Sequence, residues 1–273
     1  MAQYYQKINT IWKRDERNKI ILGEFAIPEI EYLKENIYEV TEKINGTNMS
    51  IEIMFNQDGS IKEWNIHGKT ETANIPANLL NEMNRLYNSM LEDDKLKNTF
   101  RVEKMNPDTN KLEISYPYKV TIFGEGYGAK IQGGGRYSAT PKFIVFDVMI
   151  QSSEISEPIY LLRKNVEDIC SKLSLDIVYC YGNKHLYEIL EIISTIAKNI
   201  YTSININNIK KSDYDNKYIQ EYMFSHASED ENLVIEGFVV KSPLGLKTRN
   251  GQNIVFKVKD YLDLIKEENK CRK

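Results

Sequence analysis

The chain has 273 residues, of which 41% are hydrophobic and 27% are charged. This composition is that of an ordinary globular protein and excludes wholesale disorder, and the length suits one large domain or two small ones. The formal net charge of −3 argues against a surface that coats nucleic acid non-specifically, although it is compatible with a local basic groove.

Neither end of the chain and no internal segment predicts a membrane or secretory protein. No apolar run approaches the roughly 18 residues that a membrane span requires. The N-terminal sequence Met1-Ala2-Gln3-Tyr4-Tyr5 lacks the basic and apolar regions of a signal peptide. The cysteines Cys170, Cys180 and Cys271 are an odd number in a long chain, which predicts a reduced, intracellular protein.

The first predicted elements are three short strands. Alternating apolar residues predict strands over 38–42 and 48–55, on either side of a turn at Asn45-Gly46. Asp58-Gly59 is a strong hairpin signal and leads into a third strand over 61–66.

A helix and two strands are predicted next. Apolar residues recur at helical spacing from Leu79 to Leu91, and Pro76 stands at the entrance to this helix. A strand over 118–123 is predicted to end at Gly124-Glu125-Gly126. The apolar, β-branched run 142–150 predicts a buried strand.

The remainder of the chain is predicted to contain two amphipathic helices, a polar surface excursion, two strands and a closing helix. The helices are predicted over 160–173 and 184–199, and the polar surface segment over 201–216. The strands are predicted over 233–241 and 254–259, and the closing helix over 260–268. No repeat and no linker rich in proline and glycine divides the chain, so the pattern indicates one mixed α+β domain with antiparallel sheets and peripheral helices.

Several common catalytic motifs are missing from the sequence. The histidines His67, His185 and His226 are not at zinc-site spacing, and the chain has neither a G-x-S-x-G elbow nor a P-loop. The run from Gly124 to Gly128 does not match G-x-G-x-x-G, and a tight turn at a strand end explains it better.

Charged residues do stand at the ends and on the faces of otherwise apolar strands. Lys43 ends one strand, Glu236 opens another, and Lys257 and Lys259 share one face of a third because side chains alternate along a strand. A solvated sheet face explains each of these residues singly. Together they are what lysine-mediated nucleotidyl transfer requires, because a lysine is a nucleophile only when its amine is neutral and nearby cations favour that state.

Five short motifs occur in an order that resembles the covalent nucleotidyltransferase superfamily, which contains ATP-dependent DNA and RNA ligases and mRNA capping enzymes. The resemblance is closest to the RNA ligase 2 group, which includes phage enzymes, because Glu42 precedes the lysine and Asn48 follows it by five residues. The motifs are Lys43-x-x-Gly46, Phe123-Gly124-Glu125, the Phe-Ile-Val-Phe-Asp-Val strand from Phe143 to Val148, the Glu-Gly-Phe-Val-Val-Lys strand from Glu236 to Lys241, and Lys257-Val258-Lys259.

This resemblance implies a reaction in three steps. Lys43 attacks the α-phosphorus of ATP, expels pyrophosphate and forms a lysyl–AMP phosphoramidate. AMP then passes to a 5′-phosphate end, and a 3′-hydroxyl attacks that end, releases AMP and seals the strand. ATP as AMP donor and Mg²⁺ or Mn²⁺ are therefore the implied cofactors.

The resemblance also implies roles for the other matched residues. Glu42 and the backbone near it contact adenine, and Phe143 stacks on the adenine ring or, in the alternative interpretation, is a plain core aromatic. Glu125 reaches the ribose and the metal shell, and Glu236 holds the catalytic metal through water. The remaining residues of the implied ATP-binding set are Lys257 and Lys259, which grip the α-phosphate and assist the departure of pyrophosphate, together with Asn45, Gly46, Asn48, Lys69 and Lys241.

Two of these residues depart from the family pattern. Asn45 stands where the usual motif has aspartate, which removes a charge that could help to hold metal-bound water. Lys69 stands where the family has arginine, and a lysine binds phosphate as a point charge without the bidentate fork.

The implied fold is an ATP-grasp-like nucleotidyltransferase domain of antiparallel sheets with flanking helices. We expect one adenylyltransferase domain over residues 1–273, without a C-terminal oligonucleotide-binding (OB) fold or helical domain, because only 260–273 follows the last motif. No room precedes Lys43 for the extra domain of NAD-dependent ligases, so ATP is the expected donor.

The predicted function is an ATP-dependent RNA ligase of RNA repair. Its expected partner is nucleic acid, as RNA ends or a nicked duplex, with an accessory end-binding protein and no membrane, in the cytosol of a bacterium or of a virus- or phage-infected host. The alternatives are a DNA ligase, an RNA capping guanylyltransferase and a non-catalytic domain that binds polynucleotide ends. RNA and DNA are told apart by 2′-hydroxyl contacts, which the sequence alone does not display.

Overall fold

The fold is of the α+β class and consists of two compact units. The computed structural model describes residues 4–152, 157–202 and 209–259. The first unit comprises residues 1–5 and 45–177, and the second comprises 6–44 and 178–273. The chain thus leaves the second unit after Ile44 and returns to it at Val178, so residues 45–177 of the first unit are inserted in the sequence of the second.

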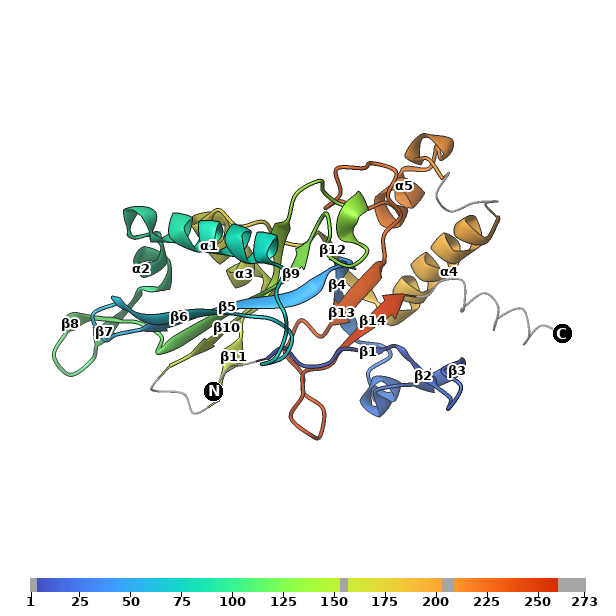
Figure 1. Cartoon of the computed structure of the whole chain (residues 1–273). Helices are drawn as coiled ribbons and strands as arrows, with labels where there is room; N and C mark the ends of the chain where they lie inside the picture. The colour runs from blue at the N-terminus through green and yellow to red at the C-terminus, as the bar shows by residue number, and fades with distance from the viewer. Residues whose placement is uncertain (1–3, 153–156, 203–208, 260–273) are drawn as a thin grey trace. The chain divides into compact units, whose positions relative to one another are not determined.

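A five-stranded antiparallel sheet forms the centre of the first unit (Figure 1). Its strands, in spatial order, are β11 (Ile159–Tyr160), β10 (Lys142–Gln151), β9 (Lys119–Tyr127), β5 (Thr47–Phe55) and β6 (Ile61–His67). β5 and β9 are buried over most of their length, and their polar residues Ser50, Glu52, Lys119 and Thr121 are buried along with the apolar ones.

Three helices contribute to the core of this unit. They are α1 (Ala77–Leu91), α2 (Lys95–Phe100) and α3 (Arg163–Leu173). Figure 1 shows α1 and α3 lying along the same face of the sheet. The core includes Leu79, Met83 and Met90 of α1 packed with Ile51 and Val145 of the strands. Beyond it, β7 (Val102–Asn106) and β8 (Lys111–Ser115) form a separate hairpin that is almost wholly exposed.

A second five-stranded sheet forms the centre of the other unit. Its spatial order is β1 (Asn9–Thr10), β14 (Val255–Lys259), β13 (Gly237–Lys241), β4 (Ile37–Lys43) and β12 (Cys180–His185). All its pairs are antiparallel except β1 with β14, which are parallel, a departure from the purely antiparallel sheets that the sequence predicts.

Helices and a small hairpin complete the second unit. Helix α4 (Leu186–Thr202) contributes Ile189, Ile193 and Ile196 to the core, and α5 (Lys217–Met223) contributes Met223. The strands β2 (Trp12–Arg14) and β3 (Ile20–Phe25) form a two-stranded sheet and are followed by the 3₁₀ helix η1 (Pro28–Tyr32). Short 3₁₀ turns elsewhere are η2 (Glu92–Asp94) and η3 (Gly134–Arg136) in the first unit and η5 (Lys211–Asp213) in the second.

Most of the predicted elements are confirmed. The strands over 38–42, 48–55, 61–66 and 142–150 correspond to β4, β5, β6 and β10, and the helix entered at Pro76 is α1. The hairpin at Asp58-Gly59 joins β5 to β6, and Gly59 takes the left-handed conformation that such turns favour, with φ +79°. The strands on either side of Asn45-Gly46 belong to different sheets, so this turn connects the two units.

Other predicted boundaries are wrong. The strand predicted over 118–123, with its end at Gly124-Glu125-Gly126, is β9 and includes these three residues and Tyr127, because 124–126 pair with both β5 and β10. The helices predicted from 160 and 184 begin at Arg163 and Leu186, because the residues just before each helix belong to β11 and to the end of β12. The strand predicted from 233 begins at Gly237.

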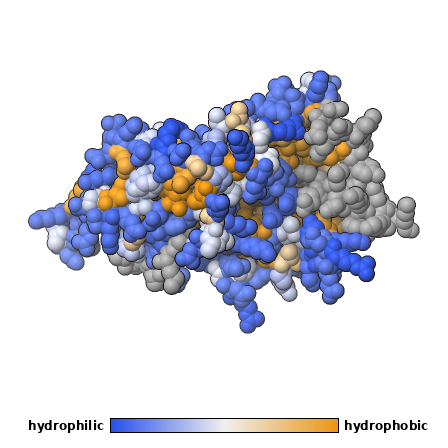
Figure 2. Space-filling model, in the orientation of Figure 1, coloured by the Kyte–Doolittle hydropathy of each residue, from blue (hydrophilic) through white to orange (hydrophobic). Residues whose placement is uncertain are grey.

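Several predictions concern residues that the structure does not describe. The closing helix over 260–268 lies outside the described residues, as does 203–208 of the polar excursion. No helix in the described ranges is long and apolar enough to cross a membrane. Figure 2 shows a face that is mainly hydrophilic, with hydrophobic residues in scattered patches.

Candidate active site

Three neighbouring strands of the second unit bring the predicted lysines onto one face of a sheet. Lys43, the last residue of β4, lies opposite Gly237 of β13, and Gly237 lies opposite Lys259 of β14. Side chains at paired positions share a face, so Lys43 and Lys259 point to the same side. Lys257 precedes Lys259 by two residues and joins them there. The period-two pattern therefore places these lysines together across strands that are distant in the sequence.

Gly237 allows β13 and β14 to lie close together. A Cβ at this position would lie 2.0 Å from the carbonyl oxygen of Val258, and its φ of +156° disfavours a side chain. Because the glycine has no side chain, β14 lies close beside β13, with Lys259 next to Glu236.

Glu236 links two of the lysines. Its Oε2 lies 2.5 Å from Nζ of Lys43, and its Oε1 lies 3.7 Å from Nζ of Lys259. The side chains of Lys43 and Glu236 are 20% and 22% exposed, so this cluster is half-buried rather than in bulk water. Nζ of Lys43 also donates a hydrogen bond to the carbonyl oxygen of Ile44, at 3.3 Å.

The same face carries a second ion pair. Nζ of Lys241 on β13 lies 3.6 Å from Oε1 of Glu39, the residue of β4 that pairs with Lys241. The face thus presents the four lysines Lys43, Lys241, Lys257 and Lys259 with the two carboxylates Glu39 and Glu236. This excess of positive charge suits a polyanionic ligand such as a triphosphate.

Glu42 points to the opposite face of β4, toward the core. Its Oε1 accepts a hydrogen bond from the hydroxyl of Ser225, and its Oε2 accepts one from the backbone N–H of His226 at 2.9 Å. The residue is only 2% exposed, and this burial raises the pKa of its carboxyl, while its hydrogen bonds to the turn oppose the rise. Its carboxylate therefore anchors the 225–227 turn, and the backbone of Glu42 is what remains for the predicted contact with adenine.

The first unit holds a second group of predicted residues at one end of its sheet. Asn48 of β5 lies opposite Glu125 of β9, and both side chains are partly exposed. A Cβ on Gly46 would lie 2.3 Å from the carbonyl oxygen of Gly126 and 2.9 Å from Cγ of Glu125. A glycine at position 46 is therefore what allows the turn to pack directly against the Glu125 side chain.

Asn45 and Lys69 lie near this end of the sheet. The side chain of Asn45 lies beside Gly133, where an added Cβ would be 2.6 Å from Nδ2 of Asn45. Lys69 is exposed and follows β6, whose last residue, His67, pairs with Ser50 of β5. Antiparallel pairing therefore directs the chain at Lys69 toward the Asn48 end of β5.

Phe143 does not join Asn48 and Glu125. It is 3% exposed and belongs to the apolar core, where its ring lies 2.5 Å from the position of a Cβ on Gly124. Phe143 pairs with Gly126, the residue after Glu125 on β9. Its side chain therefore lies on the face of the sheet opposite to that of Glu125. This position favours the alternative interpretation of Phe143 as a core aromatic, and its stacking on adenine stays a prediction.

The chemistry of the donor set fits a divalent metal held partly by water. Among the described residues, no cluster of three or more His, Cys, Asp or Glu side chains could hold a metal ion by itself. The carboxylates of Glu125 and Glu236 are hard oxygen donors of the type that Mg²⁺ and Mn²⁺ bind, and such ions commonly complete their shells with water and substrate phosphates.

The sequence pattern predicts neither the turn over 225–227 nor the position of Glu39 on the lysine face. Ser225 and His226 carry no local motif, and Glu42 contacts them across more than 180 positions of sequence. Glu39, Thr41 and Lys43 are at every second position of β4 and therefore share one face. Strand periodicity was the one signal in the sequence that could have placed Glu39 beside the lysines.

The fold and the ordered lysines and carboxylates define a protein of the covalent nucleotidyltransferase class. More narrowly, the chain belongs to the RNA ligase family, whose sequence profile matches residues 36–259. The search of curated proteins returned no match.

A solved structure of a Naegleria gruberi RNA ligase shares the fold. The apo structure of a mutant of Naegleria gruberi RNA ligase R4a is 18% identical in sequence, with a TM-score of 0.51. The match covers 98% of this chain and 65% of the ligase chain. A mutant of the Naegleria ligase with ATP and Mn is also 18% identical, with a TM-score of 0.49 and coverage of 95% and 58%. The chain thus spans about two thirds or less of the length of these ligases.

Proposed function

We propose that this protein is an ATP-dependent RNA ligase that joins a 3′-hydroxyl to a 5′-phosphate through an adenylylated Lys43. The observation that carries the proposal is the position of Lys43, half-buried at the end of β4 and connected through Glu236 to Lys259. Membership of the RNA ligase family and the similarity to a Naegleria gruberi RNA ligase solved with ATP and Mn support the choice of reaction and nucleotide.

In the first step the Lys43 amine attacks the α-phosphorus of ATP. The new N–P bond forms as the bond to pyrophosphate breaks, and the amine loses a proton. Lys257 and Lys259 bind the phosphates and stabilise the negative charge that develops on the leaving pyrophosphate. Glu236 and Glu125 are the carboxylates that would hold Mg²⁺ or Mn²⁺, each directly or through water, and a bound ion would supply further charge neutralisation.

The next two steps transfer AMP and seal the strand. A 5′-phosphate oxygen attacks the lysyl–AMP phosphorus, the N–P bond breaks, and Lys43 regains its proton. The 3′-hydroxyl then attacks the adenylylated 5′-phosphate, forming the phosphodiester and releasing AMP. Lys43 must therefore be close to both the ATP and the RNA ends.

Further residues in each unit are proposed to contribute to nucleotide binding. The backbone of Glu42 contacts adenine, and Glu125 reaches the ribose. Asn48 and Gly46 border Glu125, and Lys69 and Lys241 contribute charge toward the phosphates.

Incubation of the wild-type chain with α-labelled ATP and magnesium tests this function. We expect acid-stable label on the protein, its loss in Lys43→Ala, and its retention in Lys172→Ala, an exposed lysine of α3. Absence of label on a folded wild-type chain would overturn the proposal, and label from GTP instead would favour a capping guanylyltransferase. Nicked duplexes with RNA or DNA on each side of the nick then distinguish an RNA ligase from a DNA ligase, and binding without label indicates a non-catalytic end-binding domain.

A further inference from the structure

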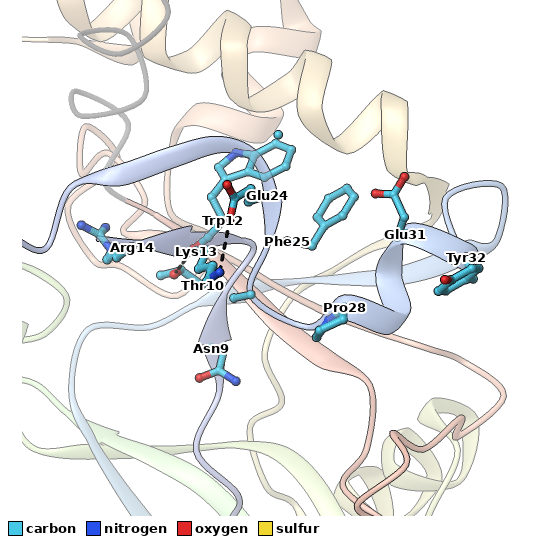
Figure 3. Close-up of a pocket in the computed structure, with 12 residues that line it drawn as sticks. Asn9, Thr10, Trp12, Lys13, Arg14, Glu24, Phe25, Pro28, Glu31 and Tyr32 are labelled. Carbon is cyan, nitrogen blue, oxygen red and sulfur yellow. Dashed lines mark hydrogen bonds and ion pairs between the residues drawn. The ribbon is translucent and has the colours of Figure 1, made fainter. Parts of the chain in front are cut away.

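A groove in the second unit lies apart from the lysine cluster. It has a volume of about 670 Å³ and runs between the β2–β3 hairpin and η1. Its walls combine the aromatic residues Trp12, Phe25 and Tyr32 with the cations Lys13 and Arg14. Figure 3 shows Arg14 and Tyr32 at opposite ends of the view, with Trp12 and Phe25 between them.

Two aromatic rings of the groove stack on each other, and a third is exposed. The rings of Trp12 and Phe25 are nearly parallel, at 17°, with centroids 4.9 Å apart. Tyr32 is 90% exposed at the end of η1. A tyrosine ring exposed to this extent contributes little to the core, so its apolar face is available for a flat ligand.

The groove continues toward the lysine cluster. A small pocket shares Thr10, Trp12 and Arg14 with the groove and is lined at its other end by Lys257 and Lys259. The connection is built into the backbone, because β1 pairs with β14 and the N–H of Ile11 donates to the carbonyl oxygen of Lys257 at 3.0 Å. All these residues belong to the same unit as Lys43.

Positive charge predominates along this path. Its cations are Lys257 and Lys259 at one end, Arg14 and Lys13 in the middle, and Lys34 beside the ring of Phe25. The carboxylates of the groove are Glu24, which lies 3.2 Å from Lys13, and Glu31, which pairs with Lys34. Both are therefore matched by a lysine, and the path is basic although the whole chain carries a net charge of −3.

We propose that this groove binds the unpaired RNA strand that leads to the joint. Arg14 and Lys13 contact the backbone phosphates, and a base stacks on the exposed ring of Tyr32. Exposed aromatic rings beside a track of cations are the combination by which proteins hold single-stranded nucleic acid without sequence preference. The inference rests on the proposed function, because it names the substrate strand that the Lys43 site would join.

The experiment compares wild type with Tyr32→Ala, Arg14→Ala and the double variant. Two measurements are made on each: self-adenylylation with labelled ATP, which needs no RNA, and the affinity for a fluorescent single-stranded RNA by anisotropy. We expect each single variant to weaken RNA binding by about tenfold and to raise KM for RNA in sealing while kcat changes little. Loss of Arg14 also lowers the slope of log Kd against log salt by about 0.7, the value for one phosphate contact.

A matched control is Tyr187→Ala on α4, a tyrosine that is 63% exposed and does not line the groove. It is expected to bind RNA as wild type does. Equal RNA affinity in wild type and the groove variants overturns the inference, as does an equal loss in Tyr187→Ala. If the wild type takes no label from ATP but the groove variants alone lose RNA affinity, the proposed ligase function fails and the RNA groove stands. A single-stranded DNA of the same sequence shows whether the groove distinguishes the 2′-hydroxyl.

Discussion

Glu236 lies 193 positions after Lys43 in the sequence, and its Oε2 is 2.5 Å from the lysine amine. Its other oxygen is 3.7 Å from the amine of Lys259. One carboxylate between two half-buried lysines offsets a repulsion that would otherwise drive the amines apart. In this arrangement Glu236 holds the two cations in place before a triphosphate arrives.

Replacing Glu236 with glutamine keeps the shape of the side chain and removes its charge. We expect Glu236→Gln to slow self-adenylylation by about tenfold to hundredfold and to raise the metal concentration that gives half-maximal rate. The reason is that the variant loses the negative charge that would bind the metal and that pairs with Lys43. Label transfer from ATP measured over a magnesium titration checks this.

The control for this variant is Glu191→Gln, on an exposed position of α4. It removes one carboxylate from the same unit and is expected to leave both the rate and the metal dependence unchanged. A Glu236→Gln protein with the wild-type magnesium profile would contradict a metal-binding role for this residue.

A side chain at position 237 is expected to separate β13 from β14. The Cβ of Gly237→Ala would lie 2.0 Å from the carbonyl oxygen of Val258, which requires the strands to move. We expect a loss of about 1–3 kcal/mol in the free energy of unfolding, measured by urea denaturation, together with slower adenylylation because Lys259 is displaced. Gly135→Ala is the matched control: no heavy atom lies within 4 Å of its added Cβ, so its stability should change by less than about 0.5 kcal/mol.

The sequence was sufficient to place the residues that depend on strand periodicity. Alternation on β14 put Lys257 and Lys259 on one face, and the structure agrees. The distribution of the lysines and carboxylates between two units could not be foreseen, because a turn of a few residues at Asn45-Gly46 looks the same whether it joins two strands of one sheet or of two. The parallel pairing of β1 with β14 was missed for the same reason, since it joins opposite ends of the chain.

The burial of two predicted site residues depends on neighbours that are distant in the sequence. Glu42 stands in an acidic and polar stretch, yet its carboxylate is buried by a turn that no local pattern connects to it. Phe143 follows the family pattern, but the glycine at position 124 opens space that its ring fills in the core. Packing between distant segments decided both positions, and a single sequence does not contain that information.

A buried ion pair in the first unit gives a prediction on stability. Nζ of Lys119 lies 3.1 Å from Oε2 of Glu52, and both side chains are only 9% exposed. Lys119→Met leaves a buried carboxylate without its cation, so we expect a loss of about 3 kcal/mol or more in the free energy of unfolding. The double variant Lys119→Met/Glu52→Leu should recover most of this loss, because the unpaired charge is gone. A double variant that is no more stable than Lys119→Met would show that the pair contributes through packing rather than charge.

The buried carboxyl of Glu42 gives the stability of the protein a dependence on pH. Burial raises its pKa above the ordinary value of 4.5, so between these two pKa values the folded chain binds more protons than the unfolded chain. The contribution of Glu42 to stability is therefore fully present below about pH 4.5 and is lost as the pH rises through the folded pKa. Glutamine at this position is neutral at every pH, and its amide can still accept from the N–H of His226 and donate to the hydroxyl of Ser225.

We therefore expect the stability of wild type relative to Glu42→Gln to fall as the pH rises above about 4.5, by at most about 1.4 kcal/mol per pH unit while the proton is released. Urea denaturation of the two proteins at half-unit steps from pH 4 to pH 8 gives this difference directly. Ser225→Ala provides an independent check, because it removes a hydrogen bond that opposes the rise and so should move the fall to higher pH. A constant difference between wild type and Glu42→Gln over the whole range would show that the carboxyl titrates alike in the folded and unfolded chain.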